Sequence, residues 1–250
     1  MEPVSRPLRT VIVDDEAPAR ALLHEYLSAH PEVEVVASCA NGFEAVKAIA
    51  QLAPDLVLLD VQMPKLDGFE VLELVEKEVA VVFITAFDEH AVRAFEVHAV
   101  DYLLKPFSAE RLSLALERVR SRLARGTPLA VAAVAAAARP RLGPADRILV
   151  RDGLAVHVIP CEKLDLVEAH DDYVVLRSEG RAYRKQKTLA EIEALLDPAR
   201  FVRVHRSFVL NVARLARLEL YAKDSRIATL TDGSKVPVSR SGYARLRELL

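Results

Sequence analysis

The chain of 250 residues predicts an open, doubly wound α/β domain followed by a mostly antiparallel β domain. In the first 123 residues, strand-like apolar runs alternate with segments of helical periodicity, which is the pattern of repeated βα units. Three of the runs, at 11–13, 56–59 and 81–84, are continuously apolar, as expected for parallel strands that helices cover on both faces. From residue 147 onward the apolar runs are short and often alternate with polar residues, which favours antiparallel strands.

The first domain is expected to contain five strands, each followed by a helix. The strands are expected at 9–13, 33–38, 56–60, 79–85 and 101–104, and the helices near 17–29, 42–51, 67–76, 89–97 and 109–123. The last of these helices shows a clear amphipathic pattern, because Leu112, Leu116 and Val119 recur at helical spacing while arginines occupy the other face. Five such units make an open parallel sheet with helices on both sides.

The second domain is expected to contain nine strands and two helices. The strands are expected at 148–151, 155–159, 164–168, 173–177, 181–184, 201–204, 217–221, 227–230 and 236–238, and the helices at 189–196 and 241–250. An acidic residue is directly followed by Gly at 152–153, 179–180 and 232–233, which is typical of tight turns. Residues 124–145 are rich in Ala and Pro and favour a tether, so we expect domains at 1–123 and 146–250.

The net charge of −2 conceals an asymmetry along the chain. Residues 1–123 hold 12 Lys and Arg against 21 Asp and Glu, a net charge of −9. Residues 124–145 add three arginines, and residues 146–250 hold 19 basic against 15 acidic residues, a net charge of +4. This difference in charge indicates different partners for the two halves. The positive charge of the second half is a weak indication that it binds nucleic acid.

Several features favour a cytoplasmic location without a membrane partner. Cys39 and Cys161 lie far apart without metal-ligand spacing, so we expect reduced thiols. The N-terminal residues lack the basic and apolar regions of a secretory signal. The longest apolar stretch, at 128–138, is about half of the ~20 residues that a membrane-spanning helix needs.

Polar residues follow the expected strands of the first domain, at the point where each strand ends. Asp14 and Asp15 end the first strand, Asp60 the third and Thr85 the fourth, and Lys105 follows the fifth. Because the carboxyl ends of parallel strands meet at one edge of the sheet, we expect these five side chains to converge there. Each residue alone has a simpler interpretation as a loop acid or a solvated lysine, but the five together predict a site.

This set of side chains suits the transfer of a phosphoryl group to a carboxylate. Such a reaction needs a nucleophile, a divalent cation to neutralise charge, and donors for the phosphate oxygens. Asp60 is the best nucleophile, since it ends the middle strand, and Asp14 and Asp15 offer the oxygen ligands that Mg²⁺ prefers. Thr85 can donate its hydroxyl to a phosphate oxygen, and Lys105 can supply a positive charge.

Residues 8–123 closely resemble the receiver domain of two-component response regulators, which has a flavodoxin-like (βα)5 fold. The resemblance lies in the acidic pair with Glu16, in the segment from Asp60 through Met63-Pro64 to Asp67-Gly68, in Thr85, and in the segment 101–107. It implies that a sensor histidine kinase phosphorylates Asp60. It also implies that Asp15 and Asp60 bind Mg²⁺ directly, that Asp14 helps through water, and that the Gln62 backbone carbonyl completes the shell. Thr85 and Tyr102 match the paired switch residues of the family.

Basic residues gather in the expected loops and strand ends of the second domain, where they can contact phosphates and base edges. They are Arg181, Arg184, Lys185, Lys187, Arg203, His205, Arg206, Arg214, Arg217 and Arg240. Residues 146–250 resemble a LytTR-type DNA-binding domain, on the segments 165–178, 187–196, 201–215 and 236–240. The resemblance implies an all-β reader of double-stranded DNA that inserts loop residues into the major groove.

By the same resemblance, three regions are candidates for base contacts. They are the loop with His170, Asp172 and Tyr173, the Arg206 position, and Arg240. The guanidinium groups of Arg206 and Arg240 could each contact a guanine. We expect Lys185, Lys187 and His205 to contact phosphates or to have structural roles.

The leading hypothesis is therefore a transcription regulator whose binding to promoter repeats is controlled by phosphorylation of Asp60. Phosphorylation would favour a receiver form that makes homodimers, which places two DNA-binding domains on paired half-sites. An alternative is a phosphorylation-controlled adaptor whose second domain binds protein. An enzymatic second domain is disfavoured, because residues 146–250 contain no phosphate-binding glycine loop, no metalloprotease motif and no metal-ligand quartet.

Overall fold

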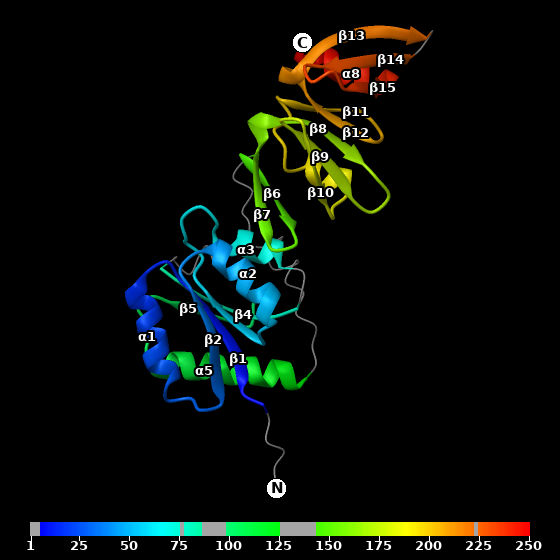
Figure 1. Ribbon diagram of the computed structural model, residues 1–250. Coiled ribbons are helices and arrows are strands. Elements are labelled where there is room, and N and C mark those ends of the chain that lie inside the picture. The colour runs from blue at the N-terminus through cyan, green and yellow to red at the C-terminus, as the bar shows by residue number, and fades with distance from the viewer. Residues whose placement is uncertain (1–5, 76–77, 87–98, 126–143, 223–224) are drawn as a thin grey trace. The chain divides into compact units, whose positions relative to one another are not determined.

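The computed structural model describes residues 6–75, 78–86, 99–125, 144–222 and 225–250 (Figure 1). The chain divides into two compact units, Met1–Pro140 and Arg141–Leu250. The helix expected at 89–97 and most of the expected tether lie outside the described residues. The exact domain boundaries expected from the sequence therefore stay a prediction.

The first unit is built on a parallel sheet of five strands in the order β2-β1-β3-β4-β5. The strands are β1 (Leu8–Val13), β2 (Val33–Cys39), β3 (Leu56–Leu59), β4 (Ala80–Thr85) and β5 (Asp101–Leu104). Every residue of β3 and β4 is buried, which explains their continuously apolar sequences. The predicted doubly wound sheet is confirmed.

Helices pack on both faces of this sheet. They are α1 (Ala17–Leu27), α2 (Gly42–Leu52), α3 (Gly68–Leu74) and α5 (Ala109–Ala124). Leu23 of α1 and Leu112 and Leu116 of α5 share one core with Leu58 and Val82 of the sheet. The α3 helix is shorter than expected and begins with a capping box, in which Asp67 accepts from the Glu70 amide and Glu70 accepts from the Asp67 amide.

The second unit contains an antiparallel five-stranded sheet in the order β10-β9-β8-β12-β11. These strands are β8 (Leu164–Ala169), β9 (Val174–Ser178), β10 (Arg181–Lys185), β11 (Phe201–His205) and β12 (Phe208–Asn211). The strand β12 was not predicted from the sequence. In the sheet it lies between β8 and β11. This strand has only four residues and follows β11 after a very short turn, so its pattern of apolar and polar residues is too short to indicate a separate strand.

Two separate cores cover the two faces of this sheet. On one face, Val167 and Val209 pack with the hairpin of β6 (Arg147–Asp152) and β7 (Ala155–Pro160) and with α7 (Leu189–Glu193). On the other face, Leu166 and Leu210 pack with α8 (Arg240–Leu249) and with the sheet of β13 (Leu215–Ala222), β14 (Ser225–Leu230) and β15 (Lys235–Val238). Short 3₁₀ helices, Cys161–Lys163 and Val212–Arg214, lead into β8 and β13. The predicted mostly-β domain is confirmed.

A buried carboxylate joins β5 to α5 in the first unit. Asp101 accepts two hydrogen bonds of 2.8 Å from the Arg111 guanidinium and one of 2.8 Å from Arg118. Arg111 also donates to the carbonyl of Tyr102 at 2.6 Å. Burial is the largest single influence and raises the pKa of Asp101, but the hydrogen bonds from Arg111 and the Tyr102 amide, together with both arginine charges, hold this pKa below its usual value.

We therefore expect Asp101→Asn to lower the free energy of unfolding by about 2 kcal/mol at neutral pH, because it removes the charge that both arginines pair with. A carboxyl with a lowered pKa stabilises the fold above its unfolded-state pKa of about 3.9, and this contribution disappears as the pH falls through the folded-state value. The difference from the wild type should thus shrink in acid. Urea unfolding of the full chain across this pH range measures it, with Glu117→Gln on the exposed face of α5 as the control. A difference that does not change with pH would contradict the assignment.

Candidate functional sites

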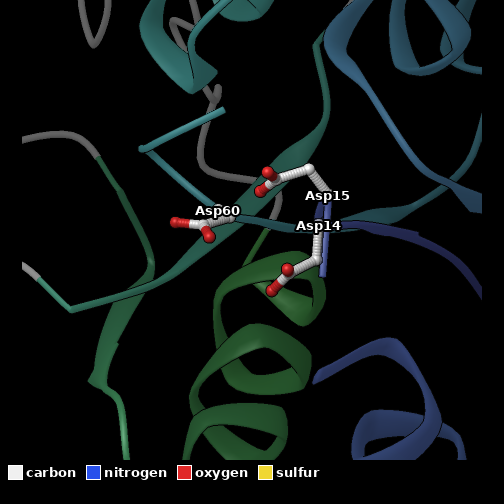
Figure 2. A group of neighbouring side chains, drawn as sticks. All are labelled: Asp14, Asp15 and Asp60. Carbon is white, nitrogen blue, oxygen red and sulfur yellow. The ribbon is translucent and has the colours of Figure 1, made fainter. Parts of the chain in front are cut away.

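Three aspartates come together at the carboxyl end of the parallel sheet. Asp14 and Asp15 directly follow β1, and Asp60 directly follows β3, which pairs with β1. One carboxylate oxygen from each residue lies within 4.8 Å of the others. Figure 2 shows the side chains of Asp14 and Asp15 both extending from the chain after β1 toward the side on which Asp60 lies. The sequence prediction that these carboxylates converge agrees with this geometry.

Lys105 places its ammonium group between two of the carboxylates. Its Nζ atom lies 2.7 Å from Asp14 Oδ2 and 2.8 Å from Asp60 Oδ2, and 3.6 Å from Glu16 Oε2. Asp14 and Asp60 are almost completely buried. A buried pair of like charges is unfavourable unless a cation lies between them, and Lys105 provides that cation.

Burial has opposite effects on these partners. It is the largest influence on Asp60 and raises the pKa of that carboxyl above its usual value, although the hydrogen bond and charge of Lys105 act against this rise. Burial lowers the pKa of Lys105, but pairing with Asp14 and Asp60 outweighs it and raises the lysine pKa overall. The lysine is therefore held in its charged form next to the carboxylate it would assist.

Short backbone contacts fix the direction of the carboxylates. The Gln62 amide donates to Asp60 Oδ1 at 3.1 Å, and the Glu16 amide donates to Asp14 Oδ1 at 2.9 Å. At the start of α3, Gly68 lies so close to the chain that a Cβ atom there would be 2.4 Å from the Asp60 carbonyl oxygen. The glycine in the predicted motif is thus required for α3 to pack against the loop that follows Asp60.

The donor set is suited to Mg²⁺. All of the candidate ligands are oxygen atoms, which is the preference of this ion. Asp14 Oδ2 is buried and receives no hydrogen bond within the described part of the chain, so its contact with Lys105 is an ion pair. Asp15 is exposed and can turn toward an ion without a loss of packing. The three aspartates therefore fit a divalent cation.

The two predicted switch residues occupy neighbouring strands. Thr85 is the last residue of β4 and is completely buried, and its carbonyl accepts a hydrogen bond of 2.8 Å from the Lys105 amide. Tyr102 lies half-buried on the edge strand β5, opposite Phe83 in the register of the two strands. Thr85 therefore lies at the same sheet edge as the aspartates, while Tyr102 lies further back along its strand.

In the second unit, a backbone hydrogen bond joins two of the three regions that are candidates for base contacts, which are called the reading regions below. The turn between β11 and β12 contains Arg206, which is exposed, and Ser207. The carbonyl of Ser207 accepts a hydrogen bond of 2.8 Å from the amide of Ala169, which immediately precedes the loop at 170–173. His205 accepts a hydrogen bond from the Ser207 amide through Nδ1 at 3.3 Å, so its other ring nitrogen is the one that bears a proton in the neutral form.

The third region is attached to the same turn through a β-bulge. The pairing of β11 with β12 shifts at Val204, and the Val204 carbonyl accepts from both the amide of Ser239 at 2.9 Å and its hydroxyl at 3.0 Å. Ser239 is the N-cap of α8, and the exposed Arg240 is the first residue of that helix. A Cβ atom at Gly242 would lie 1.9 Å from the Val204 carbonyl oxygen, so only glycine allows this approach.

Stacked side chains order the loop at 170–173. The rings of His170 and Tyr173 are parallel within 6° with centroids 4.8 Å apart, and the Arg184 guanidinium lies 3.8 Å from the centroid of Tyr173. Asp172 accepts a hydrogen bond of 2.9 Å from the side chain of Gln186. The ring stacking and the cation–π contact restrict the positions of the His170 and Tyr173 side chains within this loop.

The basic residues predicted to lie near DNA differ in their exposure. Arg206 and Arg240 are exposed, and His205 and Lys187 are half-buried. Lys185 is buried, and its ammonium group donates to the Leu149 carbonyl of β6 at 2.6 Å. These contacts favour the structural role for Lys185 over a phosphate contact, and the role stays a prediction. Lys185 lies two residues after the half-buried Tyr183 on the same face of β10, and this spacing was the signal that could have indicated its burial.

The comparisons with known proteins agree with both sites. The response regulator receiver domain family matches residues 10–117, and the LytTr DNA-binding domain family matches residues 155–250. An uncharacterized response regulatory protein of Shewanella oneidensis is 36% identical over 241 residues, which cover 96% of this chain and 97% of that protein. The transcriptional regulatory protein BtsR of Salmonella typhi is 33% identical, and the sensory transduction protein LytT of Enterococcus faecalis is 31% identical; each match covers 97% of this chain and 99% of the relative.

The chain therefore belongs to the two-component response regulators that combine a receiver domain with a LytTR DNA-binding domain. This is a family of transcription regulators. None of the helices in the described ranges is long and apolar enough to cross a membrane. The roles of individual site residues are not tested by these comparisons and stay predictions.

We expect Gly242→Ala to lower the free energy of unfolding by about 1–3 kcal/mol, because the new methyl group forces α8 away from the backbone of β11. Urea unfolding of the full chain, followed by circular dichroism, measures this change. Ser241→Ala is the matched control, since Ser241 lies on the exposed side of the same helical turn. Equal stability of the two variants would show that α8 can shift without loss.

Proposed function

We propose that a sensor histidine kinase phosphorylates Asp60 and that this modification controls the binding of the second domain to promoter DNA, and with it transcription in the cytoplasm. The observation that supports the proposal most directly is the Asp60 carboxylate, buried at the end of the sheet with two further carboxylates and the Lys105 ammonium around it. This arrangement is suited to accepting a phosphoryl group.

In the proposed reaction, a carboxylate oxygen of Asp60 attacks the phosphorus of a phosphohistidine. The new O–P bond forms an acyl phosphate, the P–N bond breaks, and the departing histidine nitrogen keeps the electron pair. Lys105, already 2.8 Å from Asp60, would offset the negative charge that the phosphoryl oxygens bring. Asp14, Asp15, Asp60 and the Gln62 carbonyl would hold Mg²⁺, which when bound neutralises charge shared by the carboxylate and the phosphoryl group.

Thr85 and Tyr102 would transmit the modification to the surface of the receiver. We propose that the Thr85 hydroxyl donates to a phosphoryl oxygen and that Tyr102 turns further inward on β5. This shift would favour a form that self-associates through the face that includes β5 and α5. In such a homodimer, the second DNA-binding domain binds its half-site at a raised effective concentration, which tightens binding to promoter repeats.

For DNA readout, we propose that Arg206 and Arg240 contact base edges, together with the loop of His170, Asp172 and Tyr173. The hydrogen bonds that connect the Arg206 turn to Ala169 and to Ser239 support this assignment, because they bring the three regions to one end of the domain. Lys187 and His205 would lie beside them on the phosphate side. Lys185 would support the fold, as its buried ammonium group indicates.

Acetyl phosphate with Mg²⁺ should add one phosphoryl group to the wild-type protein, and chelation of the metal should prevent it. Asp60→Asn removes the nucleophile and should abolish the modification, while Asp55→Asn, in an aspartate at the opposite end of the sheet, should leave it intact. Mass spectrometry of the intact protein measures the product. A phosphorylated Asp60→Asn protein would place the acceptor elsewhere.

Phosphorylated protein should bind a DNA duplex selected from a random-sequence library more tightly than unmodified protein. Arg206→Ala and Arg240→Ala should each weaken binding to the selected duplex by about 1–3 kcal/mol, with a much smaller effect on a shuffled duplex. Lys163→Ala is the control, because Lys163 pairs with Glu179 at the opposite end of the sheet. Gel-shift titrations at several salt concentrations provide the measurement. Wild-type protein without any preference for the selected duplex would contradict the DNA-binding role.

A further inference from the structure

We infer that Arg203 is a positioning residue for base readout, which holds the turn that carries Arg206 and does not itself contact DNA. The inference rests on the proposed DNA-binding function and extends it to a residue that no base would touch. Composition alone would count Arg203 among the residues that neutralise phosphates. Its contacts indicate a different role.

The guanidinium of the half-buried Arg203 is directed toward the turn. Its Nη2 atom donates to the backbone carbonyl of Arg206 at 2.9 Å, and its Nη1 atom pairs with Glu193 Oε2 at 3.2 Å. The backbone carbonyl of Arg203 in turn accepts a hydrogen bond of 2.6 Å from Arg245. Arg203 therefore connects the reading turn to both α7, through Glu193, and α8, through Arg245.

The turn needs this support because its backbone departs from regular pairing. The strand register shifts between Arg203 and His205, so a bulge interrupts the ladder just before the His205–Phe208 pair that closes the turn. The hydrogen bond to the Arg206 carbonyl supplies a constraint on the far side of the bulge. A guanidinium that contacts a guanine through two hydrogen bonds must be held to within about 0.5 Å, so a loose turn would weaken base recognition first.

The planar fork of arginine is necessary for this arrangement. Two of its nitrogen atoms donate at the same time in fixed directions, one to a carbonyl and one to a carboxylate. A lysine carries all of its donors on one nitrogen atom and lacks this fixed spacing, so we expect Arg203→Lys not to reproduce both contacts. Glu193 also compensates the charge of Arg203, so Arg203 should contribute little to the release of counterions from DNA.

The test compares the binding of wild-type and variant full-length proteins to the selected and the shuffled duplex over a range of salt concentrations. Arg203→Lys and Arg203→Ala should each lose about tenfold in affinity for the selected duplex, while their affinity for the shuffled duplex and the salt slope stay unchanged. In a protein that already carries Arg206→Ala, the Arg203 change should have no further effect, because it acts through Arg206. Lys163→Ala serves as the control for a lost positive charge far from the turn.

Glu193→Gln separates positioning from charge. Removal of a negative charge from the domain should tighten DNA binding if charge dominates, whereas loss of the anchor for Arg203 should weaken binding to the selected duplex only. Glu193→Gln and Arg203→Lys also decide the question if Arg203→Ala proves to be unfolded in thermal unfolding.

Two results would overturn the inference while the proposed function stands: a salt slope lowered by about 0.9 in Arg203→Ala, which marks a phosphate contact, or additive losses in the double variant. Loss of selected-duplex preference in the wild type itself would instead reject the proposed function and the inference together.

Discussion

The receiver site depends on one ammonium group shared by two buried carboxylates. Asp14 and Asp60 follow adjacent strands and could not both be ionised in a buried position without Lys105, which lies within 2.8 Å of each. The carboxylates in this pocket outnumber the single ammonium group of Lys105. A divalent cation is the simplest group that corrects such an imbalance, so the composition of the pocket and its proposed metal follow from the same electrostatic constraint.

Much of the first domain could be predicted from the sequence, because the residue that ends each strand of a parallel sheet can be identified locally and its position in the fold follows from that. Polar residues that end buried strands must meet at one edge, whatever the loops between them do. The first and last residues of α3 were harder to predict from the sequence. They depend on the capping box at Asp67 and on the cap at Val75, which hydrophobic periodicity does not indicate. Likewise, the pairing of Asp101 with Arg111 and Arg118 appears only when α5 is packed against β5.

The second domain was harder to predict, because antiparallel strands of four or five residues leave little pattern. The β12 strand was missed, and the basic residues could be counted but not sorted. Lys185, Arg203 and Arg206 all have positive charges in similar segments. The Lys185 ammonium group is buried against β6, the half-buried Arg203 guanidinium donates to the backbone of the turn, and Arg206 is exposed. Only the three-dimensional arrangement separates these roles. Resemblance to a family identified the domain, but it did not indicate which cations face solvent.

The double hydrogen bond between Val204 and Ser239 has a consequence for how such a regulator can change over evolutionary time. The exposed tips of the reading regions can be exchanged without disturbing the core, whereas the bulge, the cap and the glycine beneath them cannot. On the proposed function, promoter preference would diverge by replacement of these exposed residues on a constant backbone. Lineages that share this backbone could recognise unrelated half-sites while keeping the same spacing between contacts.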